Sequence, residues 1–262
     1  MTSSPSGAVV FLHAHPDDEA IFTGGTMARL AGAGHRVVLV VATGGELGMP
    51  SGMVGVLSGE ELRARRRDET AQAAEALGVS RLEFLGYRDS GVAGDPANHA
   101  PGSFFSAPAD DVAGRLATLL REEEAGALVV YDEHGIYGHP DHVKVHVVGH
   151  GGARQAGTPI VYDATVDREY LHFVETHLVV EASGADTTLG LAASTIGLPT
   201  VAVTTTVDVR DVLAVKRAAM ACHGSQIPET ASALRLPTQA FTAVYGWEWY
   251  VRHGPPGLLD EL

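Results

Sequence analysis

The sequence predicts an α/β fold: a Rossmann-like, mainly parallel sheet with helices on both faces. Apolar runs rich in β-branched residues alternate with longer helix-like segments through the first two-thirds of the chain. That alternation requires crossover connections, which place parallel strands in one sheet and helices against its two faces. Polar clusters rich in His and Asp follow directly after two of the apolar runs. Open α/β sheets carry their chemistry at the carboxyl ends of the strands, so we expect both clusters at one edge.

The N-terminal half supplies most of the expected elements. We expect strands at 8–12, 35–43, 81–85 and 127–131, and helices at 19–33, 60–77 and 109–124. Gly34 and Gly78 end the first two helices, because glycine readily adopts the left-handed conformation that closes a helix. The segments 44–59 and 86–108 are rich in Gly, Pro or Ser and are predicted to be loops. A loop as long as 86–108 is usually functional or disordered, and whether it closes over a ligand is left open.

The rest of the chain is less regular. Pro140 opens another helix, at the first-turn position that proline tolerates. We expect strands at 159–164 and 199–207, a helix at 209–222, and a terminal strand or cap at 246–250. Because no internal repeat or linker divides the sequence, residues 1–262 are predicted to form a single domain.

Composition argues against several classes of protein. The chain is 45% hydrophobic, yet its apolar runs are far shorter than the roughly 20 residues of a membrane span. Its first residues lack the basic region of a secretory signal, so we expect a cytoplasmic protein. The net charge of −14 argues against nucleic acid or an anionic membrane as partner. A small-molecule substrate remains, and the oligomeric state is open, a homo-oligomer included.

The two polar clusters suggest one metal site. They are Ala-His-Pro-Asp-Asp-Glu at 14–19 and Tyr-Gly-His-Pro-Asp-His at 137–142. Cys222 is the only cysteine, so a metal must be held by His and carboxylate rather than by thiolates. Catalytic zinc sites take three such ligands and leave one position for water. The same ligands suit iron(II) and cobalt(II), so Zn²⁺ is the expected ion and these two are the alternatives.

Each residue of the clusters suggests a role. His15, Asp18 and His142 would supply a His₂–carboxylate set for the metal. Asp17, next to a ligand, would take a proton from the attacking water. His139 would protonate a leaving amine or stabilise an oxyanion. Asp17 and Asp18 could exchange these roles, because both are carboxylates.

Three other histidines lie close to the clusters. His142, His146 and His150 share one helical face by their i,i+4 spacing. The Glu of a His-Glu-x-x-His motif is absent, so we interpret His146 and His150 as helix-packing or surface residues. Support of a metal ligand is the alternative for His146. His13 is interpreted as a packed residue at the end of a strand.

The two motifs together resemble the LmbE/PIG-L family of zinc-dependent de-N-acetylases. Arg-Asp-Ser-Gly at 88–91 and the motif at 137–142 are similar to the branch that holds the mycothiol-pathway deacetylase and mycothiol conjugate amidase. His-Gly-Ser-Gln at 223–226 resembles a C-terminal motif of the same proteins. The resemblance implies a Rossmann-like fold and hydrolysis of the N-acetyl group of an N-acetylglucosamine-type amino sugar or glycoconjugate.

The resemblance also implies residue roles. It assigns the metal to His15, Asp18 and His142, the general base to Asp17, and the electrostatic or acid role to His139. It gives Tyr137 a mobile contact with substrate and oxyanion. Asp141 would orient a site histidine, as metal-bound histidines usually require.

Five further residues are candidates for substrate binding: Glu46, Arg66, Arg88, Asp89 and Gln226. Glu46, Arg88 and Asp89 follow strand ends, where a ligand loop belongs. Arg66 matches a family position that contacts substrate hydroxyls or phosphate, and Gln226 lies in the C-terminal motif. Plain loop or solvated helix positions are the alternative for each.

Two rival functions stay open. One keeps the chemistry and changes the substrate, to a mycothiol-type thiol conjugate or a natural-product N-acyl sugar. The other is a non-catalytic, metal-dependent sugar-binding protein. Asp17 and His139 weigh against the second rival, because a binding protein needs neither.

Overall fold

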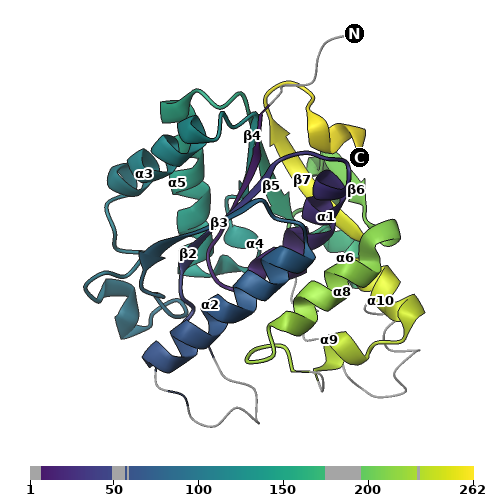
Figure 1. Ribbon diagram of the computed structural model, residues 1–262, viewed down its shortest axis with the longest axis horizontal. Helices are drawn as coiled ribbons and strands as arrows, with labels where there is room; N and C mark the ends of the chain where they lie inside the picture. Colours follow the sequence, from purple (N-terminus) through teal and green to yellow (C-terminus); the bar gives the residue numbers. More distant parts are fainter. Residues whose placement is uncertain (1–6, 49–56, 58, 175–195, 229–230) are drawn as a thin grey trace.

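The strands form one sheet that draws on both ends of the chain. The structure is a computed structural model that describes residues 7–48, 57, 59–174, 196–228 and 231–262. The described strands are β1 (Val9–His13), β2 (Val37–Thr43), β3 (Arg81–Tyr87), β4 (Ala127–Tyr131), β5 (Ile160–Thr165), β6 (Thr205–Asp208) and β7 (Trp247–His253). Their order across the sheet is β3-β2-β1-β4-β5-β7-β6 (Figure 1).

The sheet is mainly parallel. The pairs β3–β2, β2–β1, β1–β4 and β4–β5 are parallel, whereas β7 runs antiparallel to both β5 and β6. Every residue of β1, β2 and β4 is buried, which explains why these strands read as continuous apolar runs rather than as alternating ones. The predicted fold class is confirmed.

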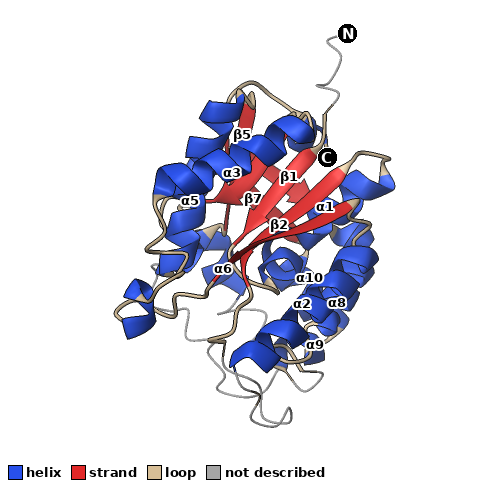
Figure 2. Cartoon of the chain, turned by 60° about the vertical axis from the view of Figure 1, so that its left-hand side comes forward, coloured by secondary structure: helices blue, strands red, loops and turns tan. Residues whose placement is uncertain are grey.

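Helices cover both faces of the sheet. They are α1 (Gly24–Gly32), α2 (Gly59–Ala76), α3 (Ala109–Glu122), α4 (Gly135–Gly138), α5 (Pro140–Ala156), α6 (Arg168–Val174), α8 (Leu213–Cys222), α9 (Ser232–Arg235) and α10 (Thr238–Tyr245). Figure 2 shows α3 and α5 packed together on one face, and α1, α2 and α8 on the other. None of the helices in these described ranges has the length and apolar character that a bilayer crossing requires.

Some predicted elements differ from the observed ones. The strand expected at 199–207 is wrong in its first half, where Thr200–Ala202 form a 3₁₀ turn and β6 begins at Thr205. The pairing of this segment with β7 starts at Thr205, which lies opposite Tyr250. The helix expected at 19–33 is interrupted, because a π-helical turn (Glu19–Thr23) precedes α1.

Other boundaries shift less. The helix expected at 209–222 is regular from Leu213, after a 3₁₀ turn at Arg210–Val212. The loop 86–108 is irregular apart from the last strand residues and the 3₁₀ turn Pro96–His99. Residues 49–56 and 58 of the loop 44–59 lie outside the described residues.

Candidate active site

The two His-Pro-Asp clusters meet because β1 and β4 are parallel neighbours. Phe11 of β1 lies opposite Val129 of β4, so the carboxyl ends of both strands reach the same edge of the sheet. The first cluster follows β1 directly, and the second spans α4 and the start of α5. Together with the loops after β2 and β3 they surround a cleft of about 370 Å³. This is the edge at which the sequence predicts the chemistry.

Three donor atoms form a nearly equilateral triangle, two of them from His15 and Asp18, which line this cleft, and one from the buried His142. His15 Nδ1 lies 3.4 Å from Asp18 Oδ2, and His142 Nε2 lies 3.3 Å from Asp18 Oδ2 and 3.3 Å from His15 Nδ1. Ligand atoms of a tetrahedral zinc ion, with bonds of roughly 2.0–2.1 Å, are separated by about 3.3 Å. Two imidazoles and one carboxylate are also donors that zinc, iron(II) and cobalt(II) accept. The residues therefore fit a divalent metal ion.

The electrostatics favour positive charge at the centre of this triangle. Burial lowers the pKa of His15, but hydrogen bonds to Asp141 and Asp18 raise it well above its ordinary value. Burial raises the pKa of Asp18, but the His142 and His15 rings hold it well below its ordinary value. A bound cation would take the place of the proton on His15 Nδ1.

Asp141 orients the His15 ring. His15 Nε2 lies 3.2 Å from Asp141 Oδ2, and because the carboxylate can only accept, Nε2 carries the hydrogen and Nδ1 is left to bind an ion. Ser90 holds Asp141 in turn, since its Oγ donates to Oδ1 at 2.5 Å and its N–H donates to Oδ2 at 3.0 Å. Sequence analysis did not single out Ser90, although it lies in the motif at 88–91.

Asp17 occupies a strained backbone conformation beside the donor triangle. Its φ of 96° is in the left-handed region, which a non-glycine residue adopts at a cost of roughly 1–3 kcal/mol. Its Oδ2 lies 3.4 Å from an Arg66 nitrogen. Burial raises the pKa of Asp17 to about 6, against the opposing charge of Arg66. The carboxylate is thus a stronger base than an ordinary aspartate.

A buried ion pair, Glu19 with His223, supports the backbone of Asp17. Glu19 Oε2 accepts from the Asp17 N–H at 3.0 Å, and Glu19 Oε1 lies 2.5 Å from His223 Nε2. Both side chains are fully buried. Burial lowers the pKa of His223, but the charge of Glu19 raises it above its ordinary value. Both residues lie in motifs that the sequence analysis quoted, but neither was named as a site residue.

His139 and Tyr137 border the cleft. His139 caps α5, with Nδ1 accepting from the Asp141 N–H at 3.2 Å, and its ring meets the His15 ring edge-on at 4.5 Å. Burial, with the nearby His15 and His142 charges, lowers the pKa of His139 to about 4. Tyr137 Oη lies 3.1 Å from His142 Nε2, and burial raises the pKa of this phenol. Tyr137 sits between residues of positive φ, Ile136 and Gly138.

The structure separates the five substrate-binding candidates into two groups. Arg66, Asp89 and Gln226 line the cleft, whereas Glu46 and Arg88 do not. Arg66 is buried and donates to the carbonyls of Gly45 and Pro16, so it also braces two loops. Glu46 is buried under the cleft, where it accepts from the Asp89 N–H at 3.2 Å.

His13 is packed as the sequence predicts. It is 1% exposed, and its ring nitrogens lie 2.8 Å from Tyr131 Oη and 2.8 Å from Thr23 Oγ1. Burial lowers its pKa to about 4, so the ring is neutral at neutral pH. The prediction that His13 is a packing residue is confirmed.

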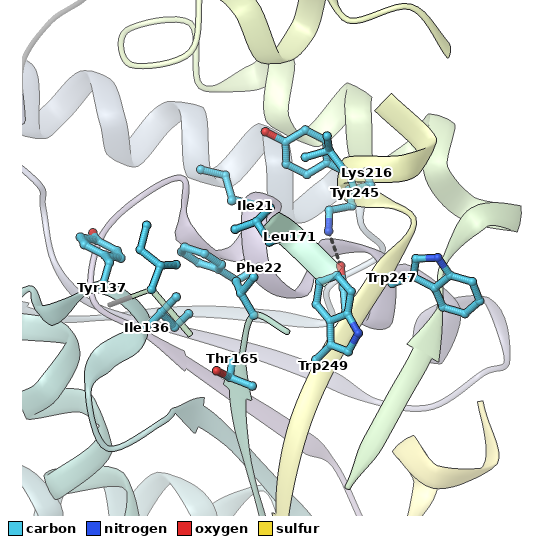
Figure 3. Close-up of a pocket in the computed structure, with 14 residues that line it drawn as sticks. Ile21, Phe22, Ile136, Tyr137, Thr165, Leu171, Lys216, Tyr245, Trp247 and Trp249 are labelled. Atoms are coloured by element: carbon cyan, nitrogen blue, oxygen red, sulfur yellow. Dashed lines mark hydrogen bonds and ion pairs between the residues drawn. The ribbon is translucent and has the colours of Figure 1, made fainter. Parts of the chain in front are cut away.

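An apolar pocket of about 310 Å³ lies next to the cleft, and Tyr137 lines both (Figure 3). Phe22, Leu171 and Trp249 are among its wall residues. A buried ion pair, Lys216 Nζ to Glu248 Oε1 at 2.6 Å, also borders it. Sequence analysis missed this pocket because its walls come from segments far apart in the chain.

Comparison with known proteins identifies the family of this chain. The family model described as "PIG-L: GlcNAc-PI de-N-acetylase" matches residues 10–150, which hold both clusters. A relative from Acidothermus cellulolyticus, named 1D-myo-inositol 2-acetamido-2-deoxy-alpha-D-glucopyranoside deacetylase, is 35% identical over 258 residues. The match covers 93% of this chain and 88% of the relative.

Solved structures share the fold at lower identity. The N,N'-diacetylchitobiose deacetylase from Pyrococcus horikoshii is 22% identical with a TM-score of 0.60, covering 96% of this chain and 84% of that one. The 4-carboxy-2-hydroxymuconate hydratase from Pseudomonas putida KT2440 is 17% identical with a TM-score of 0.61. The match covers 96% of this chain and 98% of the hydratase. Because a hydratase and a deacetylase share it, the fold alone does not assign the reaction. The family model and the relative, however, place this chain in the PIG-L (GlcNAc-PI de-N-acetylase) family.

Proposed function

We propose that this protein is a metal-dependent hydrolase that removes the N-acetyl group from an N-acetylglucosamine-type amino sugar or glycoconjugate. The observation that carries the proposal is the triangle of His15 Nδ1, Asp18 Oδ2 and His142 Nε2, with the Asp17 carboxylate beside it. The activity named for the relative, deacetylation of an inositol-linked acetamido sugar, supports the same substrate class.

His15, Asp18 and His142 would hold the metal, which we propose to be Zn²⁺, with Fe²⁺ and Co²⁺ as alternatives. When bound, the ion supplies Lewis-acid activation of water and of the amide carbonyl. Asp141, held by Ser90, keeps the hydrogen on His15 Nε2 and so keeps Nδ1 available. This arrangement is the carboxylate–histidine support that metal-binding histidines usually have.

Asp17 would act as general base. Its pKa of about 6 leaves it ionised at neutral pH while making it more basic than an exposed aspartate. The proton that it takes from water is then available to the departing amine. His139, whose pKa is lowered to about 4, is neutral at neutral pH, so its part would be electrostatic, as a hydrogen-bond donor to the developing oxyanion. Tyr137 stays protonated because its pKa is raised, so its hydroxyl can donate to the developing oxyanion.

The cleft would bind the sugar through Arg66, Asp89 and Gln226, which line it. Glu46 and Arg88 would act on the sugar only indirectly, through the loop that carries Asp89. We propose that residues 1–262 work as one domain, which the shared sheet of N- and C-terminal strands supports.

A second candidate function is favoured by the apolar pocket beside Tyr137. An N-acyl group larger than acetyl, or the apolar part of a thiol conjugate, would have about 310 Å³ of apolar space there. In that case the same residues would hydrolyse the amide of a mycothiol-type conjugate or a natural-product N-acyl sugar.

The test is release of primary amine from a panel of substrates by zinc-loaded protein. The panel contains free N-acetylglucosamine, inositol-linked N-acetylglucosamine and a thiol conjugate of an N-acylated glucosaminyl inositol. Release from the acetylated sugars that chelator abolishes and zinc restores supports the deacetylase. Release from the conjugate alone supports the second candidate. Sugar binding by calorimetry without any product from metal-loaded protein contradicts both, and supports a non-catalytic sugar-binding protein.

A further inference from the structure

A second group of histidines surrounds the carboxylate of Asp163. His146 and His150 come from successive turns of α5, Asp163 from β5 and His253 from the end of β7. His150 Nε2 lies 2.8 Å from Asp163 Oδ1, and His253 Nε2 lies 2.8 Å from Asp163 Oδ2. The third ring, His146, has its Nδ1 3.6 Å from Asp163 Oδ2. None of these residues lines the cleft of the proposed active site.

We propose that these four residues, the His–Asp cluster, form a second metal site that takes a divalent transition-metal ion such as Zn²⁺. His146, His150 and Asp163 would be the primary ligands, with His253 completing a four-coordinate set. Imidazole nitrogen and carboxylate oxygen are the ligands that zinc accepts in such sites. The active-site residues are not part of this proposal.

Three residues of the cluster bring potential donor atoms near one another. One donor atom each from His146, His150 and Asp163 lie within 4.8 Å of one another. The centroids of the His146 and His150 rings are 4.5 Å apart, and those of His150 and His253 are 4.9 Å apart. A tetrahedral zinc ion needs donor separations of about 3.3 Å, which rotations of these side chains would supply.

Hydrogen bonding leaves His146 in the form that binds a metal. Its Nδ1 is 2.9 Å from the Tyr131 carbonyl oxygen, which can only accept, so Nδ1 carries the hydrogen. In the neutral ring the lone pair is then on Nε2. Metal-binding histidines are usually held in this way, by a hydrogen bond from the ring nitrogen that does not bind.

The cluster has more imidazoles than its carboxylate can satisfy. The two oxygens of Asp163 take hydrogen bonds from His150 and His253, whereas His146 Nδ1 is bonded to the Tyr131 carbonyl, so His146 Nε2 is the nitrogen that could bind an ion. An ion would engage His146, His150 and Asp163, whose donor atoms lie within 4.8 Å of one another.

Solvent can reach the cluster although its anionic centre is buried. The Asp163 side chain is 6% exposed, whereas those of His150 and His253 are 21% and 48% exposed. An ion therefore has an entry path. A purely structural role, in which hydrogen bonds fasten α5 to β5 and β7, explains the same contacts but predicts no zinc binding.

The test measures zinc content in protein whose active-site metal is removed by Asp18→Ala. Zinc bound after gel filtration is measured by mass spectrometry for this variant and for Asp18→Ala combined with His150→Ala. We expect Asp18→Ala to retain an equivalent of zinc, and the added His150→Ala to weaken its binding by more than about 100-fold. Removing even a residue that only supports a ligand usually lowers metal affinity by roughly 10–100-fold. His134→Ala, which removes an exposed loop histidine, is the matched control and should leave zinc content unchanged.

A second variant covers the case in which His150→Ala fails to fold. His150→Gln can still donate a hydrogen bond to Asp163 but lacks an imidazole ligand. In Asp18→Ala protein loaded with Co²⁺, we expect a visible absorption band of a tetrahedral site that His150→Gln abolishes. The proposal is overturned if folded Asp18→Ala protein retains no zinc, or if its zinc content is the same with His150→Gln. Because the readout is metal content in an inactive variant, failure of the proposed hydrolase activity would not affect it.

Discussion

The ring of Tyr131 lies flat against the ring of His142, with centroids 4.3 Å apart and planes inclined by 14°. Tyr131 ends β4 and His142 lies in the first turn of α5, so the contact joins the strand end to the helix. The Nδ1 atom of His142 has no hydrogen-bond partner among the described residues. Stacking on Tyr131 therefore orients this ring in place of the usual hydrogen bond.

We expect Tyr131→Leu to weaken zinc binding at the proposed active site by roughly 10–100-fold, because His142 loses the surface that orients it. Competition with a coloured chelator measures the affinity. Tyr131→Phe is the matched control: it keeps the ring, so we expect a smaller loss of affinity, from the contact of the hydroxyl with Asp18 alone. It also lowers the free energy of unfolding by about 1–3 kcal/mol. That cost arises because the buried His13 Nδ1 loses its hydroxyl partner. Equal losses of affinity in both variants would rule out the stacking explanation.

Ser90→Ala should also weaken zinc binding, by roughly 10–100-fold, because Asp141 loses the hydroxyl that fixes it against His15. Ser106→Ala serves as control, since the Ser106 hydroxyl makes only a 3.4 Å bond to the Ser103 carbonyl. The same chelator competition measures both variants. Unchanged affinity in folded Ser90→Ala protein would show that Asp141 needs no support from this residue.

Asp17→Asn should reduce turnover by about 100-fold or more while leaving zinc content intact. The reason is that the amide cannot act as the base, whereas the proposed ligands His15 and Asp18 are unchanged. Amine release and metal content, measured on the same sample, separate the two effects. Near-normal turnover would mean that Asp17 is not the base, and loss of zinc would mean that Asp17 belongs to the ligand set.

Leu171→Trp should separate the two candidate substrate classes by filling the apolar pocket of Figure 3. We expect kcat/KM for an acetylated sugar to stay within about twofold. For a substrate with a larger N-acyl group we expect a loss of at least ~10-fold, since the fit of even one methylene is worth roughly 1–3 kcal/mol. If both substrates lose equally, the pocket does not hold the acyl group.

Asp260 should make the free energy of unfolding depend on pH in the acidic range. Burial raises its pKa, but hydrogen bonds from Thr205, Gly257 and Tyr162 and the nearby Arg252 lower it below its ordinary value. A carboxyl with a lowered pKa stabilises the fold above its unfolded pKa, near 4, and this contribution is lost as pH falls through the folded value.

We therefore expect Asp260→Asn to cost about 1–3 kcal/mol at pH 7 and progressively less below about pH 4. Urea unfolding at several pH values measures the difference. The control is Asp211→Asn, because the Asp211 side chain is 67% exposed and lies 3.8 Å from Arg29. A gap between wild type and Asp260→Asn that stays constant down to pH 3 would contradict this linkage.

The parallel half of the sheet was predictable because strands buried on both faces read as continuous apolar runs. The strand at 127–131 was predicted with the bounds that β4 has. The start of β6 was not, because it depends on where β7 offers partners rather than on the residues 199–204 themselves. The interruption at Thr23 was not predicted either; there the Thr23 hydroxyl contacts His13 and the Glu19 carbonyl.

The residues of the proposed site that the sequence predicts to lie together are those that follow neighbouring strand ends. The donors His15, Asp18 and His142 lie together because β1 and β4 are neighbours, which a parallel fold implies. The supports Ser90 and His223 were missed, because they act on site residues from other loops. Glu46 was predicted to bind the sugar; the burial of its side chain and its hydrogen bond from the Asp89 N–H depend on tertiary packing, which the sequence does not show.

The left-handed backbone at Asp17 has a consequence for protein engineering. Glycine would adopt this conformation without strain, so Asp17→Gly would recover part of the stability that the aspartate forfeits. It would also remove the carboxylate on which the proposed chemistry depends. Directed evolution of this chain for heat tolerance alone would thus favour inactive variants at this position. A library screen therefore has to select for turnover as well as for thermal stability.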